Sequence, residues 1–207
     1  MSTPQDINVR QQPAVAATGG GTDTLLATEQ LTKNFGGLTA VDSVDFSIDE
    51  GEIRCLIGPN GAGKSTLLEL ITGQLSPSEG SIYFDGRDLT GLDPHERIDT
   101  GISVKFQSPH VYENLTVEQN LQVPLQRTDR DADGVMAETL DRISLAEKAA
   151  TGASELSHGE KQRLEIGMAV TLDPTLMLLD EPVAGMSIDE TEDIAELIRS
   201  LHHDGMT

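Results

Sequence analysis

The chain has 207 residues, enough for one substantial domain with a buried core, and no apolar run in it is long enough to cross a bilayer. Its 35 acidic and 14 basic residues give a formal net charge of −21, which excludes a basic face for nucleic acid. The single cysteine, Cys55, excludes an internal disulfide framework.

The acidic residues are spread along the chain and do not form a tail. This favours a solvated acidic surface of the halophilic kind, and binding to a basic partner is the alternative. Residues 1–24 are rich in Gly, Thr, Gln and Ala and contain no apolar block of the signal-peptide type. We therefore expect a disordered leader and a cytoplasmic protein.

Strands are predicted from alternating or compact apolar runs between turn residues. They fall at residues 25–35, 40–48, 52–57, 80–86 and 175–180, with a further strand-like stretch before Gln107. The run at 52–57 predicts a buried strand in which Cys55 is a small core residue.

Helices are predicted where apolar residues recur at helical spacing. They fall at residues 64–75, 116–126, 136–150, from 157 onward, and in a last segment that places Ile194, Leu197, Ile198 and Leu201 on one face. The two middle helices flank an Asp-rich loop at 128–134 and form a mostly helical insert at about 108–155. Alternating strands and helices predict an α/β fold with a mainly parallel sheet. Because the chain stops after a helix and a glycine turn, we expect that the natural chain continues.

The segment "GPNGAGKS" matches the phosphate-binding pattern G-x-x-x-x-G-K-[ST] at every fixed position, between a predicted strand and a predicted helix. Its glycines let backbone N–H groups turn into one hollow at a helix N-terminus, which favours anions. Lys64 supplies a cation for the β- and γ-phosphates, and Ser65 a hydroxyl for Mg²⁺. The candidate residues are Gly58, Pro59, Asn60, Gly61, Ala62, Gly63, Lys64, Ser65 and Thr66.

The segment "TLMLLDEP" places two carboxylates after a predicted buried strand. Asp180 is suited to hold Mg²⁺, directly or through water, and Glu181 to polarise an attacking water. Gln107 precedes the helical insert, where a solvated loop residue and a sensor are both open interpretations.

The segment "LSHGEKQRLEIG" begins with a capping box, from Ser157 to Glu160, which predicts a helix start. Gly159 is a poor helix former in that first turn, but it lets an anion approach the N–H groups. The turn is therefore either a helix start only or a helix start that receives a phosphate.

These motifs, in this order, resemble the ATP-binding subunit of ABC transporters over about residues 25–207. The most specific part is the pair "GPNGAGKST" and "LSHGEKQR", the second similar to the family signature LSGGQ. The resemblance implies a P-loop NTPase core of the ABC ATPase type. Its N-terminal part would be antiparallel β structure, the insert at 108–155 its helical subdomain, and its C-terminal part would be missing.

The resemblance also implies a role for each candidate. Phe35 would stack on adenine (the alternative is a core phenylalanine), and residues 58–66 would hold the phosphates of ATP. Gln107 would touch Mg²⁺ and water and act in catalysis with Lys64 and Glu181. Ser157 and Gly159, with Glu160 beside them, would meet the γ-phosphate held by a second ATPase subunit, with which this chain forms a head-to-tail dimer.

The sequence departs from the family pattern at three places. His158 and Glu160 give LSHGE where LSGGQ is common, and Ser187 stands where an aspartate usually ends the following loop. The family's switch histidine would follow a strand beginning after Thr207; we interpret His202 and His203 as surface residues at a helix end.

Within the family, "LSHGEKQRLEIGM" and "EPVAGMSIDETE" look most like the ATPase subunit of urea importers, and the branched-chain amino acid importers are the alternative. Either resemblance implies ATP and Mg²⁺, two permease subunits, an indirect solute-binding protein and a place on the cytoplasmic face of the membrane. A soluble ABC ATPase acting on DNA or ribosomes, and a non-hydrolysing regulatory subunit, are the alternatives of another class.

Overall fold

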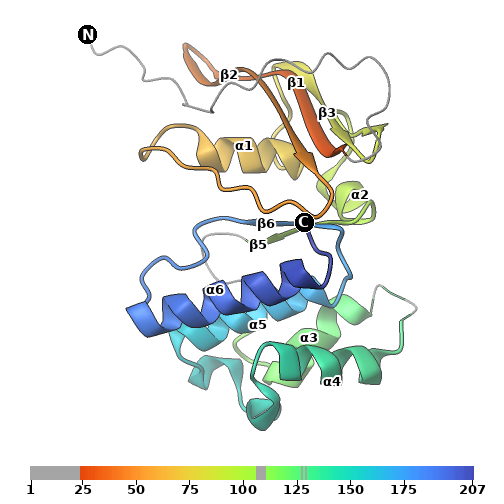
Figure 1. Cartoon of the computed structure of the whole chain (residues 1–207), viewed down its shortest axis with the longest axis vertical. Helices are drawn as coiled ribbons and strands as arrows, with labels where there is room; N and C mark the ends of the chain where they lie inside the picture. The colour runs from red at the N-terminus through yellow and green to blue at the C-terminus, as the bar shows by residue number, and fades with distance from the viewer. Residues whose placement is uncertain (1–23, 106–110, 127, 129) are drawn as a thin grey trace. The chain divides into compact units, whose positions relative to one another are not determined.

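The computed structural model describes residues 24–105, 111–126, 128 and 130–207 (Figure 1). The chain divides into two compact units, residues 1–100 with Thr207, and residues 101–206. We call them the N-terminal and C-terminal units and describe each by itself.

The N-terminal unit contains an antiparallel sheet with strand order β2-β1-β3-β4. Its strands are β1 (Thr24–Phe35), β2 (Leu38–Asp49), β3 (Glu79–Phe84) and β4 (Arg87–Asp88). In β1, Leu26 and Leu31 are both fully buried, although residues five apart lie on opposite faces of a regular strand. The strand is irregular between them, at Gln30 with a φ of 46°, and this irregularity lets both side chains turn inward. The sheet confirms the predicted N-terminal antiparallel part. Asp85 and Gly86, both with positive φ, form the two-residue turn between β3 and β4.

Two helices complete the N-terminal unit, α1 (Lys64–Ile71) and α2 (Pro94–Ile98). Helix α1 contacts β2 and buries Leu67, Leu70 and Ile71, which lie on one face at helical spacing. It ends before Gly73, whose φ of 80° is the left-handed conformation that commonly terminates a helix. The predicted helix after the glycine-rich turn is thus confirmed.

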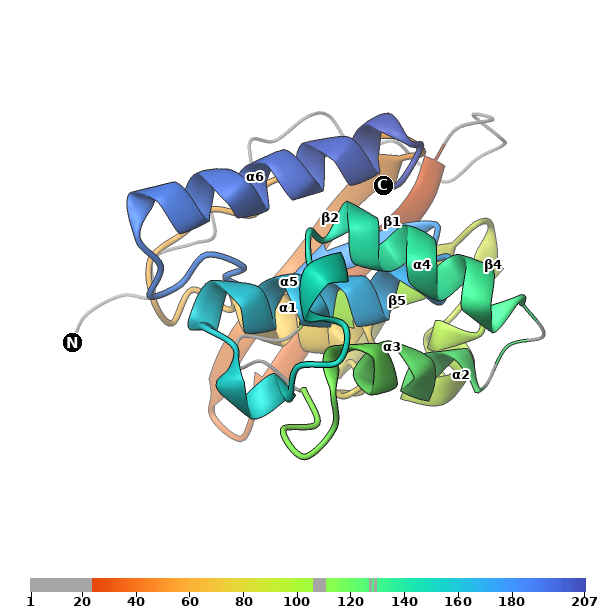
Figure 2. The same cartoon turned by 90° about the horizontal axis from the view of Figure 1, so that it is seen from below.

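The C-terminal unit pairs β5 (Ile102–Lys105) with β6 (Leu176–Leu179) in parallel, which confirms parallel character in the predicted α/β fold. Its helices are α3 (Val117–Leu125), α4 (Ala132–Arg142), α5 (His158–Val170) and α6 (Ile188–His203), with short 3₁₀ turns η1 (Ala146–Lys148) and η2 (Ala153–Glu155). Helix α5 contacts α3, α4 and α6, as seen from below in Figure 2. The hydrophobic core of the C-terminal unit includes Leu121, Leu164, Ile166 and Ile194.

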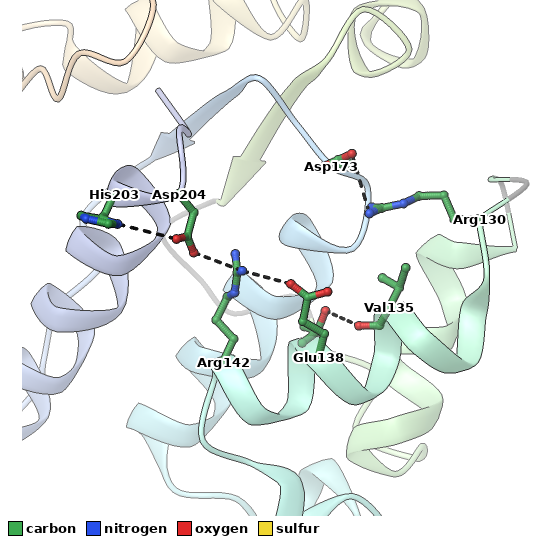
Figure 3. Close-up of polar contacts among 8 residues, drawn as sticks. Arg130, Val135, Glu138, Arg142, Asp173, His203 and Asp204 are labelled. Carbon is green, nitrogen blue, oxygen red and sulfur yellow. Dashed lines mark hydrogen bonds and ion pairs between the residues drawn. The ribbon is translucent and has the colours of Figure 1, made fainter.

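An ion-pair network joins two helices of this unit. Arg142, at the end of α4, lies 3.1 Å from a carboxylate oxygen of Glu138 one turn earlier and 3.1 Å from one of Asp204, just after α6 (Figure 3). His203 extends from the last turn of α6 with 92% of its side chain exposed. Its exposure agrees with the surface position predicted for it.

Two predicted elements are wrong. Residues 52–57 form no strand and pair with none of the four described strands of their unit. Cys55 is exposed, and Ile57 is 82% exposed, so the predicted core cysteine is a surface residue. A strand needs a neighbour to satisfy its backbone groups, and apolar composition alone does not supply one.

The predicted helix at 136–150 is also displaced. Helix α4 begins at Ala132, inside the expected loop, and ends at Arg142. Ile143 and Leu145 are both buried in the core, although residues two apart lie on different faces of a helix. Ser144, with a φ of 55°, turns the chain so that both can be buried.

Candidate functional site

The glycine-rich turn lies in the N-terminal unit and opens onto the start of α1. Gly61 and Gly63 have φ values of 79° and 86°, and Gly63 is the residue before the first helical position. An added Cβ at Gly61 would meet nothing within 4 Å, so its backbone conformation, and not space, requires glycine there. No acidic residue occupies the first turn of α1, which leaves the helix N-terminus open to an anion.

Lys64 folds back over this turn. Its Nζ donates to the carbonyl oxygens of Gly58 at 2.8 Å and Pro59 at 3.0 Å. The ammonium group is therefore held above the loop whose N–H groups would receive phosphate. Ser65 is exposed beside it and Thr66 half-buried.

Phe35 ends β1 and has 46% of its surface exposed, which contradicts the alternative of a core phenylalanine. The Nζ atom of Lys33 lies 5.3 Å from the centroid of its ring. The ring is available to stack on a planar ligand.

We expect Phe35→Ala to weaken ATP binding about tenfold, since stacking on an aromatic ring typically contributes 1–3 kcal/mol per base. Phe35→Tyr retains the ring and should bind as the parent does. Calorimetric titration with ATP checks both variants, and equal affinities for the alanine variant and the parent would remove Phe35 from the site.

The turn at residues 157–160 lies in the C-terminal unit at the start of α5. Both halves of the predicted capping box form: the Glu160 N–H donates to Ser157 Oγ at 3.3 Å, and the Ser157 N–H donates to Glu160 Oε2 at 2.9 Å. Lys148 Nζ lies 2.5 Å from the other carboxylate oxygen of Glu160. The hydrogen bond from Lys148, with those from Ser157, lowers the pKa of Glu160, and burial opposes this only in part. Glu160 therefore keeps its negative charge, which the ammonium group of Lys148 balances.

Asp180 and Glu181 follow the carboxyl end of β6 in the same unit. Asp180 is half-buried and Glu181 exposed. Glu181 has a φ of 47°, a conformation that costs energy in a non-glycine residue and occurs often at functional sites. This backbone strain supports Glu181 as a candidate reacting residue.

The structure groups the candidates by unit. Phe35 and residues 58–66 lie in the N-terminal unit, and the 157–160 turn and the Asp180–Glu181 pair in the C-terminal unit. Gln107 lies outside the described residues.

Sequence reasoning missed Glu190 as a neighbour of the 157–160 turn. Ser187 begins α6 with a second capping box, Ser187 to Glu190, and the Glu190 side chain lies against Gly159. His158 contacts the loop between β6 and α6, with its Nε2 3.1 Å from the carbonyl oxygen of Ala184. The repeated pattern, "SHGE" and "SIDE", was a signal for the second helix start but not for the contact between the two.

Comparison with known proteins places the chain in a family. A family model described as "ABC transporter" matches residues 41–184. The chain is 37% identical over 199 residues to the high-affinity branched-chain amino acid transport ATP-binding protein LivG of Salmonella typhimurium, covering 86% of this chain and 78% of that protein. It is 33% identical over 195 residues to the corresponding protein BraF of Pseudomonas aeruginosa, covering 86% and 76%.

Among solved structures, the chain is similar to MJ1267, an ATP-binding cassette of an ABC transporter. The TM-score is 0.82 at 32% identity, covering 89% of this chain and 79% of that one. The chain therefore belongs to the ABC transporter ATP-binding family. This confirms the predicted ABC ATPase fold and an ATPase activity coupled to transport. Within the described residues, no helix is both long and apolar enough to cross a membrane.

Proposed function

We propose that the chain is the ATPase subunit of an importer for branched-chain amino acids or closely similar small solutes. The observation that carries this is its identity of 33–37% to two branched-chain amino acid transport ATP-binding proteins over 86% of its length. Uptake of urea, favoured by the residues around His158 and by "EPVAGMSIDETE", is the second candidate.

ATP would bind through residues 58–66, with adenine against Phe35. Lys64 would leave the carbonyls of Gly58 and Pro59 for the β- and γ-phosphates, since a phosphate anion is the stronger partner for an ammonium group. Mg²⁺ neutralises phosphate charge when bound. The described residues contain no group of three or more carboxylates, histidines or cysteines that could hold a metal. Mg²⁺ typically takes one or two protein ligands plus phosphate oxygens. Ser65 and Asp180 are the proposed ligands, with Gln107.

Glu181 would accept the proton of a water that attacks the γ-phosphate. The 157–160 turn would face the γ-phosphate bound by a second ATPase subunit, in a head-to-tail dimer. The argument for a dimer is chemical, because one chain carries both a phosphate loop and a separate helix start. Closure of the two ATPase subunits would move two permease subunits at the cytoplasmic face of the membrane. A solute-binding protein would deliver solute.

Solute uptake by cells tests the assignment. Deleting the gene should abolish uptake of labelled leucine while leaving urea uptake unchanged, and the parent gene but not a Glu181→Gln copy should restore it. Loss of urea uptake alone would favour the second candidate. Unchanged uptake of both solutes would contradict both.

A further inference from the structure

Glu190 is held in a fixed position at the start of α6. The Ser187 N–H donates to Glu190 Oε2 at 3.0 Å, and the Ser187 hydroxyl donates to the same oxygen at 2.9 Å. This capping box occupies one carboxylate oxygen. The other oxygen, Oε1, is free to meet a different partner.

Oε1 of Glu190 points at Gly159. A Cβ added to Gly159 would lie 2.9 Å from Oε1 and 3.3 Å from both Cδ and Cγ of Glu190. The hydrogen bonds from Ser187 lower the pKa of Glu190 most, and the Gly159 amide and the charge of His158 lower it further. The Glu190 carboxylate thus lies against Gly159, where the Gly159 N–H helps to stabilise its charge.

The surroundings show why a second anion competes with Glu190. A cavity of about 30 Å³ lies between the two helix starts, lined by Ser157, Gly159, Glu160, Arg163, Glu190 and Asp193. It has three carboxylates and one guanidinium. Glu160 is neutralised by Lys148, whereas Glu190 faces the glycine directly. A phosphate that reaches Gly159 therefore meets the Glu190 charge at close range, and the two like charges repel.

We propose that Glu190 is an internal anion that occupies the phosphate-accepting face of the 157–160 turn and must withdraw before a γ-phosphate docks. The proposal rests on the proposed function, in which this turn receives the γ-phosphate of a second subunit. Glu190 is a positioning residue that raises the ATP concentration needed for subunit closure. Its withdrawal from Gly159 also loosens the contact between the starts of α5 and α6. Phosphate binding therefore changes the conformation of residues 184–190.

Glu190→Gln tests this without removing the helix cap, because an amide oxygen accepts the same bond in a capping box. Glu192→Gln, two residues along α6 at an exposed position, is the matched control with the same change of charge. Both changes are made in the full-length protein carrying Glu181→Gln, and dimer formation is followed by light scattering against ATP concentration. Thermal unfolding of each variant confirms equal stability.

The Glu190→Gln variant should dimerise at a roughly fivefold lower ATP concentration, the effect of removing one partly exposed charge interaction, and Glu192→Gln should match its parent. With Glu181 intact, the KM for ATP should fall in Glu190→Gln while kcat stays constant, a change that a purely structural role of Glu190 does not produce. Equal ATP dependence of the two variants overturns the proposal and leaves the proposed function standing. A parent that remains monomeric with ATP overturns the proposed function, and this proposal with it.

Discussion

Glu181→Gln should lower ATP turnover by about 10²–10⁴-fold, the usual contribution of a positioned general base, while ATP binding is retained. The amide matches the carboxylate in size but cannot accept a proton from water. The strained φ of 47° at Glu181 places this side chain just beyond the end of β6, and the substitution leaves that backbone unchanged. An ATP-bound dimer should therefore accumulate.

Phosphate release and size-exclusion chromatography with ATP measure the two effects. Glu196→Gln, at an exposed position on α6, is the control and should hydrolyse ATP at the parent rate. If the Glu181→Gln protein turns over normally and elutes as a monomer with ATP, Glu181 is not the base and the proposed dimer is wrong.

Arg97→Leu should lower the free energy of unfolding by about 3 kcal/mol, because buried carbonyl groups that lose their donor cost 1–3 kcal/mol each. Arg97 is only 2% exposed. Its guanidinium donates to the carbonyl oxygens of Leu70 at 2.7 Å and Ile71 at 2.8 Å, at the C-terminal end of α1. It also donates to the carbonyls of Leu92 and Thr90.

These bonds explain why a charged side chain is tolerated in the interior. Burial lowers the pKa of Arg97, and the charge of Asp88 opposes this in part. The last carbonyls of a helix have no partner within the helix, so Arg97 supplies donors that α1 cannot. Because α1 begins at the glycine-rich turn, Arg97 also stabilises the helix that carries the candidate phosphate site.

Denaturant unfolding checks the stability change, and the melting temperature should fall by about 10 °C for a domain of this size. Arg87→Leu, in exposed β4, removes the same charge and should leave the midpoint nearly unchanged. Arg97→Lys should be intermediate, since an ammonium group cannot reach all four carbonyls. An Arg97→Leu protein as stable as the parent would show that water replaces the guanidinium.

Local chemistry could be predicted from sequence because it depends on neighbouring residues. The glycine-rich turn before α1 and the capping box at Ser157 appear where the pattern placed them. Hydrophobic spacing also located β1, β2 and α6. The resemblance in motif order led to the ABC ATPase family, which the family match confirms.

Residues 52–57 show the limit of this reasoning. Their apolar run resembles a buried strand, yet Ile53 is 48% exposed and Ile57 82% exposed. Burial depends on what packs alongside, and no single run of residues contains that information. Arg97 illustrates the same limit from the opposite side. A buried arginine is uncommon without partners, and two of its four carbonyl partners lie 26 and 27 residues away in the chain.

The sequence by itself determined the phosphate loop, the two capped helix starts and the carboxylates after β6, since each is a short pattern with its own physical cause. Only the tertiary structure decided that Glu190 lies against Gly159, 31 residues earlier in the chain, and that His158 contacts the carbonyl of Ala184. Such contacts arise because α5 and α6 pack together in one core. Packing between distant segments is set by the shape of the whole unit and not by the pattern of either segment.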